Sequence, residues 1–152
     1  MRTLKLKISI KVPFFSTEDR LKLESLIYNL LGELPNLTEI KEADLVYLTA
    51  NDIDIRSLRP FYVYIREHEI IDTVRKYAIV NPVEQVITFN IHKQALTVGK
   101  IAVVSEDTSP PLGNAELTIQ VEDTEKFLKW FTPKTIEGKV QNPTKFKDIF
   151  NL

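Results

Sequence analysis

The N-terminal segment of the chain alternates between apolar and polar side chains. Its apolar residues occupy every second position and are Leu4, Leu6, Ile8, Ile10 and Val12. A period of two places one set of side chains in a core and the other set in water. Residues 3–12 are therefore predicted to form a half-buried strand that ends at Pro13.

Four further stretches have strand character. Residues 117–121 alternate in the same way as the N-terminal segment, and residues 38–50 are expected to form one or two strands. Residues 86–90 and 101–105 are expected to be strands on either side of a turn with the sequence KQALTVGK. The chain is therefore predicted to contain several strands that follow one another without a helix between them.

Apolar residues at helical spacing occur between these strands. A helix is expected to start at Ser16 or Thr17, whose side chains suit an N-cap, and to stop at Gly32. The apolar stripe of this helix consists of Leu23, Leu26, Ile27, Leu30 and Leu31. Further helices are expected within residues 53–80, with Pro60 in a first turn, and at residues 124–131.

The order of these elements decides the fold class. Neighbouring strands without an intervening helix imply antiparallel pairing, so the chain is predicted to be α+β, with a mostly antiparallel sheet and helices packed on one face. The length of 152 residues suits one domain. Residues 1–132 are assigned to that domain, and residues 133–152 to a C-terminal tail that packs on the domain or on a partner.

Composition and charge exclude several classes of protein. Hydrophobic residues make up 43% of the chain, and no stretch approaches the roughly 18 apolar residues of a membrane span. The chain has no cysteine, which excludes disulfides, thiolate zinc sites and cysteine nucleophiles. We therefore expect a cytoplasmic protein without membrane contact. The formal net charge of −1 argues against a protein that coats nucleic acid by bulk charge.

No constellation of catalytic or metal-binding residues stands out. His68 and His92 are the only histidines, and neither has a second histidine at the spacing of metal ligands. No serine lies in a glycine-rich elbow, and Gly99-Lys100 is a lone pair rather than a phosphate-binding loop. The sequence therefore predicts a protein that is not an enzyme and that uses no metal or cofactor.

Basic residues are the remaining chemical lead. If the apolar positions of the first strand face inward, then Lys5, Lys7 and Lys11 point outward together, and such a row can contact successive phosphates. A second interpretation is that alternate lysines keep an exposed strand soluble and block edge pairing. Charge alone does not decide between the two.

Several segments in order resemble a family of uncharacterised small archaeal proteins. They are IIDTVRKYAI, ITFNIHKQALTVGKIAVV, SPPLGNAELTIQV and FLKWFTPKTIEGK, with Thr17-Glu18-Asp19 as a further match, and together they cover most of the chain. His92, Thr108 and Asn114 depart from the family pattern, which has asparagine, glutamate and proline there. Since all three lie in the motif region of residues 92–114, the details of a ligand site in that region would be altered here.

The resemblance implies both a fold and a function. The family is labelled RNA-binding and is predicted to associate with the exosome, and its fold is similar to that of the large-subunit ribosomal protein that binds 5S ribosomal RNA. We therefore expect an RNA-binding protein without catalytic activity that takes part in RNA processing or degradation. Its candidate RNA-binding residues are Lys5, Lys7, Arg75, Lys76, His92, Lys93, Gln94 and Lys100.

The alternative interpretation is a homodimeric assembly or interaction protein with no role in nucleic-acid binding. It rests on a concentration of apolar side chains near the C-terminus, namely Phe127, Trp130, Phe131, Phe146, Ile149 and Phe150. A tail that does not fold back on its own core would present these side chains to a partner. A small-molecule enzyme is a third interpretation, and no group of residues supports it.

Overall fold

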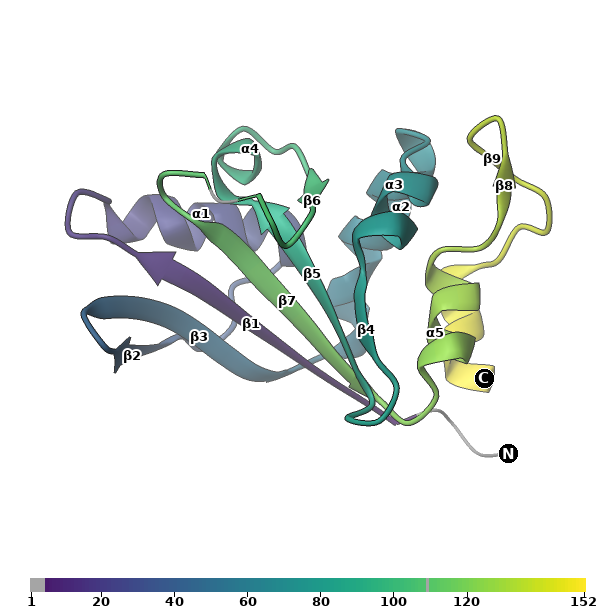
Figure 1. Cartoon of the computed structure of the whole chain (residues 1–152), viewed down its shortest axis with the longest axis horizontal. Coiled ribbons are helices and arrows are strands. Elements are labelled where there is room, and N and C mark those ends of the chain that lie inside the picture. Colours follow the sequence, from purple (N-terminus) through teal and green to yellow (C-terminus); the bar gives the residue numbers. More distant parts are fainter. Residues whose placement is uncertain (1–4, 109) are drawn as a thin grey trace.

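The structure is a computed structural model that describes residues 5–108 and 110–152. Residues 1–4 and Ser109 lie outside this description, so the predicted place of Leu4 in the first strand and the first residue of the SPPLGN segment lie outside it too. Within the described residues, seven strands form one antiparallel sheet (Figure 1). The prediction of an α+β protein with a mostly antiparallel sheet is therefore confirmed.

The spatial order of the strands differs from their order in the chain. It runs β2 (Thr38–Glu42), β3 (Leu45–Ile53), β1 (Leu6–Phe14), β7 (Asn114–Val121), β5 (Val86–His92) and β4 (Ile79–Asn81), and β6 (Val103–Val104) also pairs with β5. The three central strands β1, β7 and β5 thus come from the start, the end and the middle of the chain. Contacts between residues far apart in sequence hold the sheet together.

The helices follow or separate these strands (Figure 1). They are α1 (Arg20–Leu31), the 3-10 helix η1 (Ile55–Leu58), α2 (Arg59–Glu67), α3 (Ile71–Tyr77), α4 (Lys93–Thr97), α5 (Thr124–Phe131) and the 3-10 helix η2 (Phe146–Asn151). A small separate hairpin consists of β8 (Thr135–Ile136) and β9 (Lys139–Val140). None of the helices within the described residues has the length and apolar character needed to cross a membrane.

Two helix boundaries differ from those that the sequence predicts. The cap of α1 is Asp19, whose side chain accepts a hydrogen bond from the Leu21 N–H at 2.9 Å, so the prediction of Ser16 or Thr17 is wrong. The residues before Asp19 instead form a turn that positions Glu18. The helical stretch predicted to reach residue 80 also ends early, because Ile79–Asn81 pairs with β5 as a strand.

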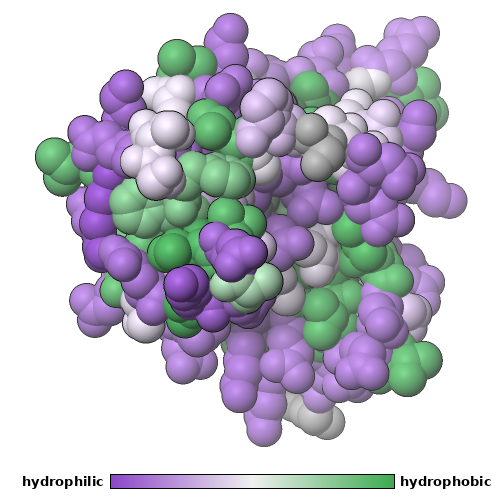
Figure 2. All heavy atoms as spheres, turned by 60° about the vertical axis from the view of Figure 1, so that its left-hand side comes forward, coloured by the Kyte–Doolittle hydropathy of each residue, from purple (hydrophilic) through white to green (hydrophobic). Residues whose placement is uncertain are grey.

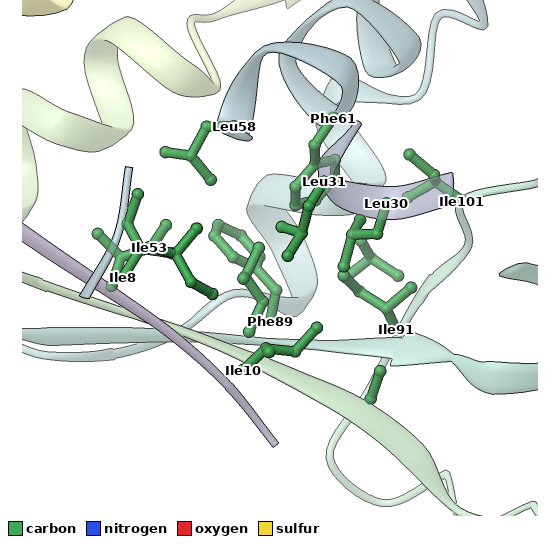
Figure 3. Close-up of a cluster of buried hydrophobic side chains, with 14 of the residues drawn as sticks. Ile8, Ile10, Leu30, Leu31, Ile53, Leu58, Phe61, Phe89, Ile91 and Ile101 are labelled. Atoms are coloured by element: carbon green, nitrogen blue, oxygen red, sulfur yellow. The ribbon is translucent and has the colours of Figure 1, made fainter. Parts of the chain in front are cut away.

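One face of the sheet carries the core. Figure 3 shows Ile8, Ile10, Phe89 and Ile91 of the sheet facing Leu30, Leu31, Leu58 and Phe61 of the helices. Phe89 meets Phe61 edge to face with ring centroids 5.5 Å apart, and Phe131 of α5 lies 5.7 Å from Phe89. Edge-to-face aromatic contacts add to the burial of apolar area, so this cluster joins α2 and α5 to β5.

The chain after α5 runs back along α2 and α5. Trp130 Nε1 donates a hydrogen bond to the Lys145 carbonyl at 3.0 Å, and the ring of Phe146 lies 5.4 Å from that of Tyr62. The apolar side chains that suggested a partner are mostly used inside this chain, since Phe127, Trp130, Phe131 and Ile149 are at most 2% exposed. Phe150 stays 43% exposed. The homodimer therefore stays a prediction, with less apolar surface behind it.

Two glycines with positive φ angles provide a matched test of the packing between β1 and the loop before β7. A Cβ atom on Gly113 would lie 2.7 Å from Pro13 Cγ, whereas one on Gly99 would have no atom within 4 Å. We expect Gly99→Ala to cost about 1 kcal/mol through backbone strain alone. We expect Gly113→Ala to cost about 2–4 kcal/mol, because the steric clash adds to the strain. Urea unfolding measures both variants, and equal losses would contradict the close approach of Gly113 to Pro13.

Candidate functional site

The candidate site begins where β5 ends. Lys93–Thr97 forms the short helix α4, with His92 as its N-cap, and His92 Nδ1 accepts a hydrogen bond from the Ala95 N–H at 3.2 Å. The expectation of a simple turn at residues 93–100 is therefore wrong. His92 supplies a helix cap that the apolar pattern does not reveal, and its Nδ1 is occupied within the chain.

Lys93 points into the protein. Its side chain is 2% exposed. Its Nζ donates hydrogen bonds to the carbonyl oxygens of Pro13 at 2.6 Å and Leu112 at 2.9 Å, and to Glu18 Oε1 at 2.7 Å. An ammonium group has three protons, and each has an acceptor here. Lys93 was a predicted phosphate contact, but its position excludes that role because no proton is left for RNA.

Glu18 makes the burial of this ammonium possible. The Glu18 side chain is 11% exposed, and its Oε1 also accepts a hydrogen bond from the Phe15 N–H at 3.0 Å. Burial lowers the pKa of Lys93, and the hydrogen bond from Lys93 to Glu18 acts in the opposite direction. The carboxylate and the two carbonyl oxygens replace the water that the ammonium loses. Lys93 therefore has a structural role.

Arg75 is also engaged within the chain. It lies in α3, and its guanidinium donates hydrogen bonds to the carbonyl oxygens of Thr132 at 3.2 Å and Pro133 at 2.8 Å, and to Asp72. These bonds fix the chain where it leaves α5. Lys76 is exposed beside it, with its Nζ 5.4 Å from the centre of the Tyr77 ring. Lys76 is therefore exposed and able to contact a phosphate, whereas the Arg75 guanidinium is already hydrogen-bonded within the chain.

The remaining predicted residues are exposed but lie at opposite ends of the sheet. Lys7 pairs with Gln120, which pairs with Val86 at the start of β5, whereas Gln94 and Lys100 follow His92 at the end of β5. Val86 and His92 are six positions apart along β5. This separation corresponds to roughly 20 Å along the strand. Lys5 lies two residues before Lys7 in the sequence, at the same end of the sheet and farther from Gln94 and Lys100. The predicted residues therefore do not form one basic patch.

A different surface emerges from strand alternation. The side chains that alternate with the core residues of β1, β7 and β5 point to the other side of the sheet. This side is called the open face here, and its central residues are Lys7, Ser9, Lys11, Glu116, Thr118, Gln120, Thr88 and Asn90. These side chains can donate and accept hydrogen bonds, and their charges are of both signs.

Lys11 connects the open face to the β2–β3 hairpin. Its Nζ donates a hydrogen bond to Glu42 at 2.7 Å and lies 4.3 Å from the centre of the Tyr47 ring. The bond to Glu42 and the nearby charge of Glu116 raise the pKa of Lys11. Lys11 therefore stays cationic at neutral pH, and it retains two protons for a further acceptor.

A hollow of about 540 Å³ occupies one end of the open face. Its lining includes Lys11, Tyr47, Asn90, Asn114 and Glu116 from the sheet, together with side chains of the loop between β6 and β7. Figure 2 brings forward the side with the start of α1 and the β2–β3 hairpin, where hydrophobic atoms gather and hydrophilic atoms surround them. The residues predicted from the sequence do not include Asn90, and Asn114 is named there only as a departure from the family pattern. The available signal was an asparagine at an outward position of the apolar strand VITFNIH.

Residues 5–108 and 110–152 contain no group of three or more histidine or acidic side chains placed to hold a metal ion. The hollow instead offers amide, carboxylate and ammonium groups beside an aromatic ring. Such groups bind ligands by hydrogen bonding and stacking.

The proteins similar in sequence carry the family name UPF0201. No protein-family model matches the chain. A UPF0201 protein of Sulfurisphaera tokodaii is 39% identical over 132 residues, which cover 87% of this chain and 90% of that protein. A UPF0201 protein of Pyrococcus horikoshii is 29% identical over 138 residues, with 91% of this chain and 97% of that protein covered.

Two solved structures share the fold. The crystal structure of a UPF0201 protein from Methanococcus jannaschii has a TM-score of 0.71 at 22% identity and covers 90% of this chain and 99% of that chain. A DUF54 protein from Methanothermobacter thermautotrophicus has a TM-score of 0.56 at 19% identity and covers 80% and 88%. At these identities the likeness concerns the fold alone.

Removal of the Lys93 ammonium tests its structural role. We expect Lys93→Met to lower the free energy of unfolding by about 3–5 kcal/mol, because Glu18 is left as a buried carboxylate without its partner. The double variant Lys93→Met/Glu18→Gln should lose less than the sum of the two single losses, since the unpaired charge is gone. Chemical denaturation measures all three variants.

The exposed pair Lys129 and Glu125 provides the control. Their charged atoms are 3.6 Å apart and their side chains are 77% and 80% exposed. Lys129→Met should therefore change the free energy of unfolding by less than about 0.5 kcal/mol. A Lys93→Met loss as small as this one would show that the buried ammonium does not hold the structure together.

Proposed function

The chain belongs to the UPF0201 family of archaeal proteins, and from that premise we propose that it is an RNA-binding protein without catalytic activity. RNA lies across the open face of the sheet. The sequence resemblance supports this function because it connects these motifs with RNA processing or degradation and with the fold of a 5S-rRNA-binding ribosomal protein. That support is an analogy of family and fold, so a specific surface is needed as well.

The carrying observation is the sheet with one face in the core and the other face lined by hydrogen-bonding side chains. Lys7, Ser9 and Lys11 run along the central strand β1, and Thr88 and Asn90 run along β5. Single-stranded RNA presents phosphates, ribose hydroxyls and unstacked bases, which lysines, polar side chains and aromatic rings respectively recognise. A flat strand surface can present all three kinds of group at once.

The charges on this face predict a binding mode of modest salt dependence. Lys5, Lys7 and Lys11 are three cations along β1 and the residue just before it, and Lys11 is paired with Glu42, which leaves Lys5 and Lys7 for phosphates. Each phosphate neutralised on a single strand contributes about −0.7 to the slope of log affinity against log salt, so two contacts give a slope of about −1.4. Glu42 and Glu116 oppose any larger electrostatic attraction. Hydrogen bonds and stacking must therefore supply much of the affinity.

Lys7 is the residue that tests this face. We expect the full-length chain to bind single-stranded RNA at about 50 mM salt, with a slope of about −1.4 in a salt series followed by fluorescence anisotropy. Lys7→Gln should weaken binding and reduce the size of the slope by about 0.7, because one phosphate contact is lost. Lys126→Gln, an exposed lysine of α5, serves as the control and should change neither quantity.

Two results would contradict the proposal. One is the lack of detectable RNA binding at about 50 mM salt, where electrostatic contacts are strong. The other is an equal effect of Lys7→Gln and Lys126→Gln, which would mean that RNA is not held on the open face.

A further inference from the structure

The hollow on the open face contains an amide group that no described residue hydrogen-bonds. Asn90 lies between the core residues Phe89 and Ile91, so its side chain points to the open face. Although it points away from the core, Asn90 is only 8% exposed, and it lines the hollow. Among the described residues, its side chain makes no hydrogen bond. The Asn90 amide atoms are not buried themselves, so they are available to a ligand in the hollow.

A second amide group in the same hollow is half satisfied. Asn114 Nδ2 donates a hydrogen bond to the Thr108 carbonyl at 2.9 Å, which holds the loop between β6 and β7 beside the sheet. Asn114 Oδ1 is buried, and no described residue donates to it. Asn90 pairs with Glu116 across β5 and β7, two residues along from Asn114. One unpaired amide group, one half-satisfied amide group and a carboxylate thus lie on neighbouring positions of one face.

The charges in the hollow exclude phosphate as the preferred ligand. Its lining contains Lys11, Glu106 and Glu116, and the charge of Lys11 is already balanced by Glu42. The surplus charge is therefore negative, which repels an anion. Carboxylate and amide oxygens instead accept hydrogen bonds from N–H donors. The ligand that suits this hollow is neutral and carries amino groups.

The apolar part of the lining favours a flat ligand. The rings of Tyr47 and Phe15 and the prolines Pro13 and Pro110 all contribute to the hollow. Aromatic and proline rings offer flat surfaces on which a planar heterocycle can stack. The volume of about 540 Å³ lies within the range of small-molecule sites and leaves room for a nucleoside.

We infer that the hollow is a subsite for a nucleobase with an exocyclic amino group. The amino group of cytosine, adenine or guanine donates to the exposed carboxylate of Glu116, and the Asn90 amide contacts the ring edge. Uracil lacks an exocyclic amino group and leaves an acceptor unpaired, so the subsite rejects it. For RNA this inference rests on the proposed function, because it adds base selection to the phosphate contacts of β1.

Free nucleosides test the hollow without any phosphate. Cytidine, adenosine and uridine are titrated into the full-length chain by isothermal titration calorimetry or NMR. We expect cytidine and adenosine to bind, and uridine to bind roughly tenfold more weakly, which corresponds to the loss of about one hydrogen bond. Asn90→Ala should reduce the affinity for cytidine and adenosine by roughly tenfold.

Matched variants separate a binding effect from a folding effect. Asn142→Ala is the control, because Asn142 is an exposed asparagine of the loop between β9 and η2 and does not line the hollow. It should leave nucleoside binding unchanged. If Asn90→Ala lowers the unfolding midpoint, the exposed Glu116→Gln provides the second test and should also weaken binding. The inference is overturned if neither Asn90→Ala nor Glu116→Gln changes the affinity for cytidine and adenosine.

The results for RNA and for nucleosides distinguish the two proposals. RNA binding with the expected salt slope but with equal affinity for oligo(C) and oligo(U) overturns the base subsite and leaves the proposed function intact. Selective nucleoside binding without RNA binding overturns the proposed function and leaves a nucleoside site. No binding of any nucleoside at millimolar concentration overturns the inference.

Discussion

The buried ammonium of Lys93 ties together the end of the molecule at which the candidate site lies. Its three acceptors, on Pro13, Glu18 and Leu112, are 80, 75 and 19 residues away in the sequence. Hydrophobic contacts favour compactness without direction, whereas three short charge-assisted bonds define where each segment lies. β1, the approach to α1 and the loop before β7 therefore meet at one point. The loop that ends at this point also lines the hollow, so the hollow depends on the same interaction.

The helices cover one face of the sheet and leave the open face uncovered. The helices pack on the face that carries Ile8, Phe89 and Leu117, which leaves the alternating side chains of the same strands in contact with solvent. A face of this kind must be polar enough to remain in water and regular enough to present side chains at fixed intervals. These two demands also describe a platform for an extended polymer. The open face therefore combines a structural requirement with a binding capacity.

Local pattern was sufficient to predict most of the fold and insufficient to predict the site. Strand alternation and helical stripes depend on neighbours in the sequence, so β1, α1 and the antiparallel sheet could be expected. Lys93 could not be recognised as buried, because a lysine beside a glutamine looks exposed until Glu18 is brought to it from 75 residues away. α4 was missed because its cap is the histidine His92. Asn90 drew no attention because one polar residue in an apolar strand has no partner within the local sequence.

Charge and shape together limit how the proposed RNA ligand could be held. A chain with a net charge of −1 and one row of three lysines, of which Lys11 is paired with Glu42, releases few counterions, so phosphate contacts alone give weak binding of modest salt dependence. Occupancy at cellular salt then requires contacts that salt does not screen, namely stacking and hydrogen bonds to bases. The hollow offers both kinds of contact beside Lys11. The excess negative charge of its lining repels phosphates, which are therefore expected at Lys7 and Lys5. Base recognition at one end of β1 and phosphate contact at the other end are therefore complementary halves of one surface.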